Sequence, residues 1–439
     1  MRGDEANGRC GAYGTDVRKS PTLVAKARKL GPAFDLLANY RAGGFFFERS
    51  GLGLAGMGVA GRIRAKAGPE RILRLAQLTT EALRAIRRQD DGPSPIAVAA
   101  IPFDDRWAAD ALIPSRVVVR HVPGETWELD VFPEGFAPPD AEREGWTGRE
   151  VPHDAFHDIQ LRPDPEPDDY SEAVAGAAKR IRAGSLRKVV LARTLLVDAE
   201  RALDAKQLLW RLRAVDPDCY AFASPEPPPD LARPGGILVG ASPELLVMRR
   251  GREVRAVPLA GSAPRFGDFK RDQISAGRLL SSEKDREEHA VVVEDVARVL
   301  GGYCDGLTRP LEPELLGTAN VWHLATPFAG RLHDPSVTTL DLVAALHPTP
   351  AVCGTPREEA REALSELEPI DRGRYAGPVG WVDANGDGEW AIALRCAEIT
   401  GTTARLFAGA GIVADSVPEE ELDETEAKFR ALLDSLRWG

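Results

Sequence analysis

The sequence predicts an α+β fold, and three observations support this class. Segments with strand and helix patterns are interspersed, without the strict βαβ alternation of a doubly wound sheet. Hydrophobic residues make up 43% of the chain and charged residues 28%, as in an ordinary soluble globular protein. No internal repeat is visible in the 439 residues, a length that accommodates two or three average domains or one large unit.

The first part of the chain is predicted to mix strands with one long helix. Apolar patterning predicts strands at 44–48, 96–101 and 115–121 and a helix near 70–89. Residues 133–169 are rich in Pro, Asp and Glu, so we expect a long surface connection there.

The second part is predicted to contain longer elements. In chain order they are a helix at 170–183, a strongly apolar strand at 188–197, strands at 237–240 and 245–249, and an amphipathic helix at 282–300. A hairpin, a glycine-rich loop and a final helix complete the chain. Ser416 and Glu419 have the spacing of a capping box, and Pro418 stands where helices often begin.

Composition excludes several classes of function. The net charge is −11 and no Lys- or Arg-rich stripe is present, which argues against nucleic-acid binding. No run of eighteen apolar residues is present, so no membrane span is expected. Five scattered cysteines without CxxC or Cys/His spacing indicate neither a disulfide framework nor a zinc site. We therefore expect a cytoplasmic protein, with disorder over residues 1–20.

Two motifs are better explained by hairpins than by ligand binding. Residues 51–56 match GxGxxG, but Gly58 and Gly61 continue the glycine run, which disfavours the helix that a dinucleotide site requires. Residues 383–388 open like a calcium-binding loop, but its twelfth position is Leu394 instead of a bidentate Glu. Strand-like flanks indicate a turn between two strands.

Two residues are candidates for acid–base chemistry. Lys188 heads the apolar segment KVVLAR; desolvation or a nearby cation would keep it neutral and able to take a proton from water. Glu244 is flanked by apolar residues in ILVGASPELLVM, and burial there would raise its pKa and suit it to act as a general acid. The competing interpretations are a solvated strand end for Lys188 and an outward-pointing turn residue for Glu244.

Acidic residues gather on two predicted helices. Asp285, Glu287 and Glu288 fall within one turn beside His289, where repulsion requires either water or a cation. In the last helix, Glu421, Glu424 and Lys428 share one face. Glu288 and Glu424 are each candidates to give one ligand to Mg²⁺, which commonly takes few protein carboxylates. The competing interpretation is a solvated helix surface in both places.

Groups suited to hold an anion lie nearby in the sequence. Arg395 ends the apolar stretch AIALR, an unusual place for a charge unless it pairs with a buried carboxylate. Gly409 and Gly411 allow backbone N–H groups to approach a ligand carboxylate, and Lys428 and Tyr375 are placed to assist.

Nine ordered motifs between Lys188 and Lys428 resemble the chorismate-utilising enzymes, which include isochorismate synthases, salicylate synthases and component I of anthranilate synthase. The motifs are KVVLAR, GASPELL, PLAGSAPR, SEKDREEH, HLATPF, HPTPAVCGTP, YAGPVGW, IALRCAEI and AGAGIV with EEELDETEAK. The resemblance implies two large antiparallel sheets packed together with helices outside. It also implies a single domain over residues 21–439, with the strongest match at 170–435.

The resemblance implies a role for each matched position. Lys188 corresponds to the base that activates water, and Glu244 to the acid that protonates the departing hydroxyl. Glu288 and Glu424 correspond to the Mg²⁺ ligands, with Asp285 and Glu421 in or near the surrounding layer. The remaining positions correspond to substrate-binding residues, namely Ser262, His323, Ala351, Tyr375, Arg395, Gly409, Gly411 and Lys428.

Among the activities of this family, the resemblance favours a Mg²⁺-dependent isochorismate synthase acting on chorismate. Lys188 is typical of members that use water, so no glutaminase subunit is expected, and we expect a monomer. Ala351 resembles isochorismate synthases, whereas salicylate synthases, the main rival activity, tend to carry threonine there. Cys353 departs from the glycine often found at its position. Two further hypotheses are an ammonia-using synthase and a chorismate-binding protein without activity. The product is compatible with siderophore or menaquinone synthesis.

Overall fold

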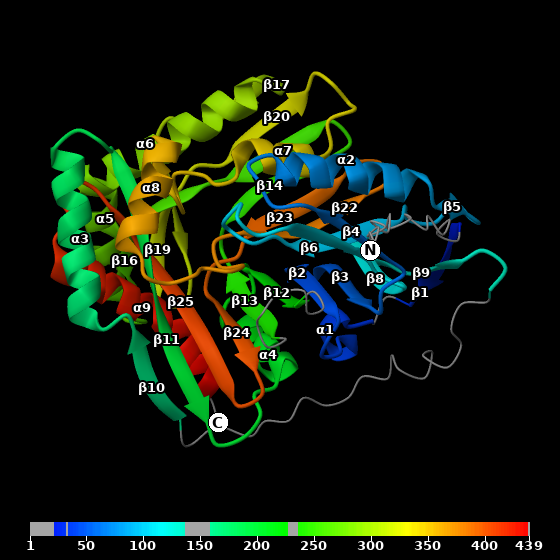
Figure 1. The fold of residues 1–439 in the computed structure, drawn as a ribbon, viewed down its shortest axis with the longest axis horizontal. Helices are drawn as coiled ribbons and strands as arrows, with labels where there is room; N and C mark the ends of the chain where they lie inside the picture. The colour runs from blue at the N-terminus through cyan, green and yellow to red at the C-terminus, as the bar shows by residue number, and fades with distance from the viewer. Residues whose placement is uncertain (1–21, 32–33, 137–158, 227–235, 438–439) are drawn as a thin grey trace, which may run out of the picture.

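A computed structural model describes residues 22–31, 34–136, 159–226 and 236–437. Within these ranges the strands form two large sheets and one small sheet, with helices on the outside (Figure 1). This confirms the predicted α+β class. The expected disorder of residues 1–20 lies outside the described residues. No helix within the described ranges is long and apolar enough to cross a membrane.

The largest sheet of the described residues has 13 strands, and the pairs are antiparallel except for the parallel pair β1 and β5. In spatial order the strands are β10 (Ile159–Asp164), β11 (Lys188–Ala199), β25 (Thr403–Ile412), β24 (Cys396–Thr400), β13 (Ile237–Ser242), β12 (Tyr220–Pro225), β2 (Phe45–Arg49), β3 (Leu52–Met57), β8 (Arg116–Val122), β9 (Glu125–Pro133), β1 (Leu23–Leu30) and β5 (Arg87–Arg88), with β21 (Gly354–Thr355) beside β11.

The second sheet has nine strands and packs against the first. Its spatial order is β17 (Cys304–Thr308), β20 (Phe328–Leu332), β15 (Glu253–Val257), β14 (Leu245–Arg250), β23 (Gly388–Ile392), β22 (Pro378–Asp383), β6 (Ile96–Ala100), β7 (Ala109–Ile113) and β4 (Gly61–Ala65). Apolar side chains from both sheets, such as Phe47 and Trp381, form one continuous core. Burying this surface is the main source of the fold's stability.

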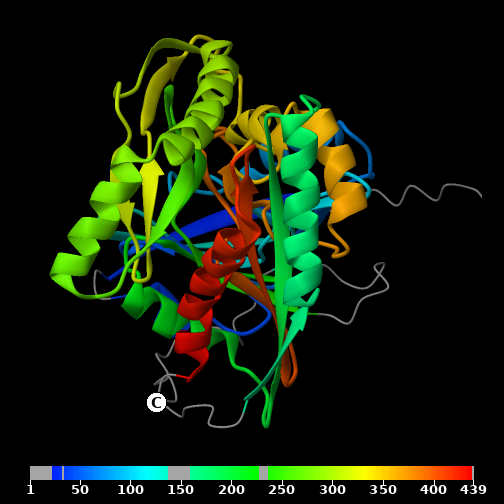
Figure 2. The same ribbon diagram turned by 90° about the vertical axis from the view of Figure 1, so that its left-hand side faces the viewer.

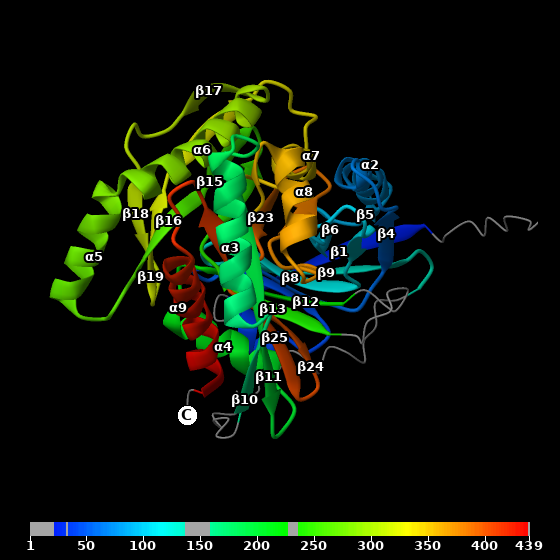
Figure 3. The same cartoon turned by 60° about the vertical axis from the view of Figure 1, so that its left-hand side comes forward.

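The small sheet consists of β16 (Leu259–Pro264), β19 (Val321–Ala325) and β18 (Glu314–Gly317). It lies beside helices α5 and α6 at one end of the molecule (Figure 3). The helices of the described residues are α1 (Leu36–Asn39), α2 (Arg71–Arg84), α3 (Pro167–Arg182), α4 (Ala205–Val215), α5 (Phe269–Ser281), α6 (Glu283–Gly301), α7 (Thr339–Leu346), α8 (Arg357–Leu367) and α9 (Pro418–Arg437).

Helices α3 and α9 pack against β11 and β25, which follow the edge strand β10 in the large sheet (Figure 2). A buried arginine of β11 ties α9 to these strands: the Arg193 Nε donates to the Thr425 hydroxyl at 2.8 Å, and its guanidinium lies over the Phe429 ring. The start of β11 and the first turns of α9 are therefore held beside each other.

Both hairpin predictions are confirmed. The glycine-rich residues 51–56 join and enter the β2–β3 hairpin, in which Phe45 pairs with Gly56. Residues 383–388 form the turn between β22 and β23. Neither segment opens a helix.

Two predicted elements near residues 70–89 and 408–413 require correction. The helix expected near 70–89 ends at Arg84, because residues 87–88 pair with β1 as strand β5. The expected glycine-rich loop is part of strand β25, in which Gly409 and Gly411 pair with β11.

Three further local predictions require correction. The segment 133–169 is not only a connection, because it contains the edge strand β10; its residues 137–158 lie outside the described ranges. Helix α3 begins three residues before the expected start, where Pro167 and two aspartates suit the first turn. Pro418 starts α9 as predicted, but the Ser416 hydroxyl accepts a hydrogen bond from the Val413 N–H at 3.1 Å instead of capping the helix.

Candidate active site

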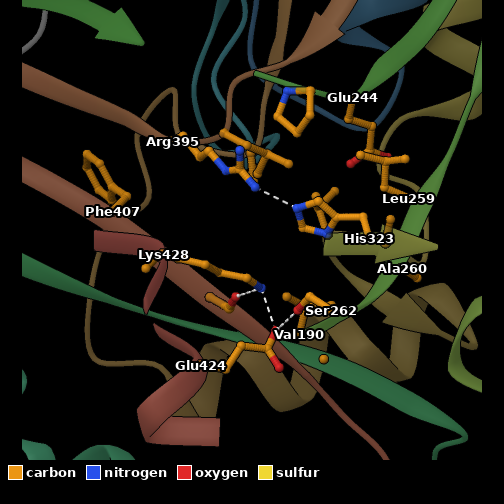
Figure 4. A pocket seen from close by; sticks show the side chains of 18 of the residues that line it. Val190, Glu244, Leu259, Ala260, Ser262, His323, Arg395, Phe407, Glu424 and Lys428 are labelled. Atoms are coloured by element: carbon orange, nitrogen blue, oxygen red, sulfur yellow. Dashed lines mark hydrogen bonds and ion pairs between the residues drawn. The ribbon is translucent and has the colours of Figure 1, made fainter. Parts of the chain in front are cut away.

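A cavity of about 80 Å³ lies where β11, β25, β16 and the start of α9 meet. Three predicted site residues do not line it: Lys188, Asp285 and Glu421. The others do, and Figure 4 shows several of them pointing toward one another. These are Glu244, Ser262, Glu288, His323, Ala351, Tyr375, Arg395, Gly409, Gly411, Glu424 and Lys428. Residues spread over 185 positions of the sequence thus line one cavity. The role of each residue there stays a prediction.

Glu244 lies in the short connection between β13 and β14, with its side chain at the cavity. Its backbone is held on both sides, since its N–H donates to the Ser242 hydroxyl and its carbonyl accepts from the Ile392 N–H. The residue is 3% exposed. Burial raises the pKa of its carboxyl to about 8, against the smaller opposite effects of a hydrogen bond from the Leu259 backbone and of the Lys188 and Lys428 charges. The outward-pointing interpretation is therefore wrong, and Glu244 carries a proton at neutral pH.

Lys188 is fully buried behind the cavity wall, so a solvated strand end is also wrong. It is the first residue of β11 and pairs in register with Thr355 of β21. Its Nζ lies 2.9 Å from the Glu288 Oε1, an ion pair whose angle falls short of a hydrogen bond. Burial was predicted, but the neighbouring group is a carboxylate and not a cation.

Gly411 makes this ion pair possible. A Cβ atom at Gly411 would lie 2.1 Å from the Glu288 Oε1 and 3.0 Å from the Lys188 Cε. Gly409, two residues earlier on β25, leaves room for the Tyr375 hydroxyl, which would be 3.1 Å from a Cβ there. The two glycines were predicted to admit a ligand, and the structure adds that they make space for neighbouring side chains.

Arg395 has an imidazole partner instead of the expected carboxylate. Its Nη2 lies 2.6 Å from the His323 Nε2, as drawn in Figure 4. Burial, and then Arg395 and Lys428, hold the pKa of His323 well below its usual range, so its neutral Nε2 accepts from the guanidinium. Strand β23 ends at Ile392, before Arg395, whose φ of 46° marks a tight turn. The Arg395 Nη1 has no hydrogen-bond partner within the described ranges.

Among the acidic residues of α6 and α9, Glu288 and Glu421 are buried, and Asp285 and Glu424 are half-buried, so the solvated-surface interpretation is wrong for Glu288 and Glu421. It holds for Glu287, which is exposed. Glu288 is 8% exposed and Glu421 only 1%. Burial, followed by the Glu424 charge, raises the pKa of Glu421. Burial also acts to raise the pKa of Glu424, but Lys428 and Ser262 outweigh it and leave that pKa below its ordinary value.

Each of three carboxylates is paired with a lysine. Besides the pair of Lys188 with Glu288, the Lys284 Nζ donates to Glu421 at 2.7 Å and the Lys428 Nζ donates to Glu424 at 2.6 Å. The Ser262 hydroxyl donates to the same Glu424 oxygen at 2.7 Å. Asp285 is the fourth carboxylate, and burial and then the Glu288 charge raise its pKa. The cluster therefore holds four carboxylates against three ammonium groups.

Sequence reasoning missed one ion pair that shapes the cavity. Arg372 lines it and is bidentate to Glu368, at 2.6 and 2.7 Å. Its guanidinium also donates to the Val190 carbonyl of β11 and to the Val352 carbonyl, while Glu368 accepts from the Ala192 N–H. The pair thus hydrogen-bonds the backbone of β11 at Val190 and Ala192. These residues lie between the part of β11 that pairs with β21 and the part that pairs with β10. The i,i+4 spacing of a Glu and an Arg before YAGPVGW is the signal that was available.

We expect Arg372→Met to lower the free energy of unfolding by about 3–5 kcal/mol, because Glu368 would stay buried without its cation. Urea unfolding of the two proteins measures this difference. The matched control is Arg180→Met, which breaks the exposed pair with Glu366 and should cost no more than about 1 kcal/mol. Equal losses in both variants would contradict a structural role for the buried pair.

The fold and the cavity together define a class of protein. A protonated carboxyl, two cationic side chains and a paired cluster of carboxylates around one buried cavity are the parts of an acid–base enzyme for a small, negatively charged substrate.

Comparison with known proteins identifies the family. The family profile described as chorismate binding enzyme matches residues 143–437. Isochorismate synthase DhbC of Bacillus subtilis is 41% identical over 91% of this chain and 94% of its own length. The chain therefore belongs to the chorismate-binding enzyme family.

Two solved structures share the fold. The putative 2,3-dihydroxybenzoate-specific isochorismate synthase DhbC of Bacillus anthracis has a TM-score of 0.78 and 37% identity, covering 92% of this chain and 99% of that one. Component I of anthranilate synthase from Streptococcus pneumoniae has a TM-score of 0.60 over 97% and 95% of the two chains; at 22% identity it supports the fold alone. The anticipated two-sheet architecture is thus confirmed.

Proposed function

We propose that this chain is an isochorismate synthase, which adds water at C2 of chorismate while the C4 hydroxyl departs. The observation that carries the proposal is a protonated Glu244 facing Arg395 and Lys428 in one buried cavity. The two DhbC relatives named above are isochorismate synthases by name, and this chain spans nearly all of their length.

Substrate carboxylates have suitable partners in the cavity. The Arg395 Nη1 is free of protein acceptors within the described ranges, while Nη2 is occupied by His323. Lys428 lies across the cavity from Arg395 in Figure 4. Tyr375 stacks on Phe407 with ring centroids 5.0 Å apart, which fixes its hydroxyl near Gly409. Charged hydrogen bonds of this kind orient the substrate against Glu244.

The acid role follows from the state of Glu244, whereas the base role requires a change of state at Lys188. Glu244 holds a proton at neutral pH and delivers it to the departing hydroxyl. Lys188 takes a proton from the attacking water. Because Lys188 is paired as an ammonium with Glu288 behind the cavity wall, this role requires Lys188 first to lose its proton and to leave Glu288, so that a neutral amine faces the water.

The carboxylate cluster fits a Mg²⁺ ion. Glu288 and Glu424 both line the cavity and offer hard oxygen donors, and the cluster has one more carboxylate than ammonium groups. Within the described ranges no group of three His, Cys, Asp or Glu side chains is placed to hold a metal ion, so water and substrate oxygens would have to supply the remaining ligands. When bound, Mg²⁺ would neutralise and orient a substrate carboxylate. Asp285 and Glu421 stand one turn earlier on the same helices.

The experiment that tests the function is product analysis after incubation of the purified protein with chorismate. We expect a mixture of chorismate and isochorismate that forms only with Mg²⁺. Salicylate and pyruvate in equal amounts would assign the protein to the salicylate synthases, against Ala351 at the cavity wall. Product that requires ammonium ions would indicate an amino-transferring synthase, and binding without turnover a non-catalytic protein.

We expect kcat/KM to fall above about pH 8, as Glu244 in the free enzyme loses its proton. A series of kcat/KM measurements at different pH, at fixed ionic strength and saturating Mg²⁺, measures this fall. A profile that stays level to about pH 9.5 would show that another group is the acid.

Water as the nucleophile removes the need for a glutaminase partner, and we propose that the enzyme works alone as a monomer in the cytoplasm. Light scattering during gel filtration is expected to give the mass of one chain, 47.4 kDa. A mass of two chains would overturn the proposal of a monomer.

A further inference from the structure

A second cavity, of about 250 Å³, lies between the start of α2, the 103–105 loop, α7 and α8. It has no lining residue in common with the catalytic cavity. Its wall includes Phe103, whose ring packs over the Arg372 guanidinium at 4.4 Å. The two cavities are therefore separate but lie on either side of a shared layer of side chains.

The second cavity contains a buried cation that forms no ion pair within the described residues. Arg71 is 3% exposed, and its Nη2 donates to the carbonyls of Pro102 and Phe103. Its Nη1 has no hydrogen-bond partner, and no carboxylate within the described ranges forms an ion pair with it. Burial lowers the pKa of Arg71 to about 10, so it remains charged at neutral pH. Burying a charge of this kind costs free energy unless a ligand or a water molecule accepts its remaining hydrogen bonds.

His347 is a second buried polar group with unused atoms. It is 5% exposed, and neither ring nitrogen makes a hydrogen bond of good geometry. Burial, and then the Arg71 charge, lowers the pKa of His347 to about 3, although the Phe103 backbone acts in the opposite direction. The ring is therefore neutral and offers one N–H donor beside Arg71. Its edge meets the Phe103 ring, with centroids 5.8 Å apart.

The two arginines of this wall differ in their partners. Arg361 is paired with Asp105 at 2.6 Å, whereas Asp105 and Asp104 act on Arg71 only through their charges and form no ion pair with it within the described residues. Helix α2 begins at Arg71, and Glu70 provides no side-chain cap, so the positive end of a 14-residue helix adds to the site. Asp341 and the exposed Glu70 also line the cavity; their charges oppose any anion and oppose a dianion about twice as strongly as a monoanion.

The remaining wall is apolar, formed by Ile72, Phe103, Ala344 and Pro348. We propose that this cavity binds a small monocarboxylate, with its carboxylate on Arg71 and His347 and its apolar body against Phe103. The site is separate from the catalytic cavity and does not depend on the reaction proposed above.

Benzoate is the probe, with inorganic phosphate as the dianionic comparison. Isothermal titration calorimetry is carried out on the full chain carrying Arg395→Ala, which disables the carboxylate site of the catalytic cavity. We expect one benzoate per chain and at least tenfold weaker binding of phosphate. Adding Arg71→Met should weaken benzoate binding at least about tenfold, since a charged hydrogen bond is lost. Arg74→Met, exposed on the same helix and outside the cavity, should leave it unchanged.

Two further variants keep the test decisive if Arg71→Met does not fold. Glu70→Gln at the exposed rim should strengthen benzoate binding severalfold by removing a repulsive charge. Ala345→Trp, on the partly exposed side of α7, should fill the cavity and abolish binding. Benzoate binding that is absent up to about 10 mM, or unchanged in these variants, would overturn the proposal.

Discussion

Lys188→Ala is expected to lower kcat by about 10²–10⁴ while the protein stays folded, because general-base catalysis of this kind contributes about that factor to the rate. Steady-state rates of isochorismate formation at saturating chorismate and Mg²⁺ measure the loss. Circular dichroism and the unfolding midpoint report whether the fold persists. Retained turnover would remove Lys188 from the mechanism.

The position of Lys188 makes this variant more than a simple deletion. The side chain is fully buried and its ammonium is the partner of the Glu288 carboxylate. Removing it leaves Glu288 without that cation, so we expect some loss of stability in the absence of Mg²⁺ and recovery of part of it when the ion is added. Recovery of stability without recovery of rate would separate the base role from the structural one.

Lys284→Ala is the matched control. Lys284 also neutralises a buried carboxylate of the same cluster, at 2.7 Å from Glu421, but it does not line the cavity. At saturating Mg²⁺ its loss should change kcat by less than about tenfold. Similar losses in both variants would mean that charge balance, and not proton transfer, accounts for the effect at Lys188.

Glu244→Gln is expected to lower kcat by about 10²–10⁴, because glutamine keeps the size and polarity of the side chain but has no proton to deliver. The substitution should leave KM for chorismate nearly unchanged, since Arg395 and Lys428 still hold the substrate carboxylates. The same initial-rate assay gives both constants. A variant with full kcat would show that the departing hydroxyl is protonated by another group.

Stability against pH provides an independent readout for Glu244. Its pKa is about 8 in the folded protein against an ordinary value of 4.5, so the folded state binds more protons than the unfolded state between these two values. The native enzyme should therefore lose stability as pH rises from 4.5 to 8, and Glu244→Gln should not show this part of the loss. Parallel curves for the two proteins would contradict the raised pKa.

Glu48→Gln is the control for this substitution. Glu48 is 4% exposed, and burial raises the pKa of its carboxyl as well, but it lies on β2 outside the cavity. We expect kcat within about threefold of the native value, since no proton transfer depends on it. A large loss there would indicate that any buried carboxyl in this fold affects the rate through packing.

Much of the fold was predictable because the relevant signals are local. Apolar runs such as the one that starts at Lys188 stay in strands, and glycine or Asn-Asp-Gly turns form hairpins, since backbone sterics act over a few residues. Boundaries moved where a cap or a strand pairing prevailed: Pro167 began α3 early, and pairing with β11 made a strand of residues inside an expected connection.

The set of candidate site residues was also predictable, because the chemistry restricts which side chains suit an acid, a base, a cation ligand or a carboxylate partner. Eleven of the fourteen predicted residues line one cavity, and their roles there remain predictions. The pairings among them were not predictable. Arg395 bonds His323, which lies 72 positions away, where a carboxylate was expected.

The sequence by itself therefore determined most of the secondary structure, the family and the residue types of the site, since each depends on residue type and short-range order. Only the tertiary structure decided that Lys188 forms an ion pair with Glu288, and that Arg372 and Glu368 together hydrogen-bond the backbone of β11. It also placed Arg71 and His347 in the wall of a second cavity. Those contacts depend on which distant segments pack together. The burial that results, and not the residue types alone, sets the charge state and the available partners of each group.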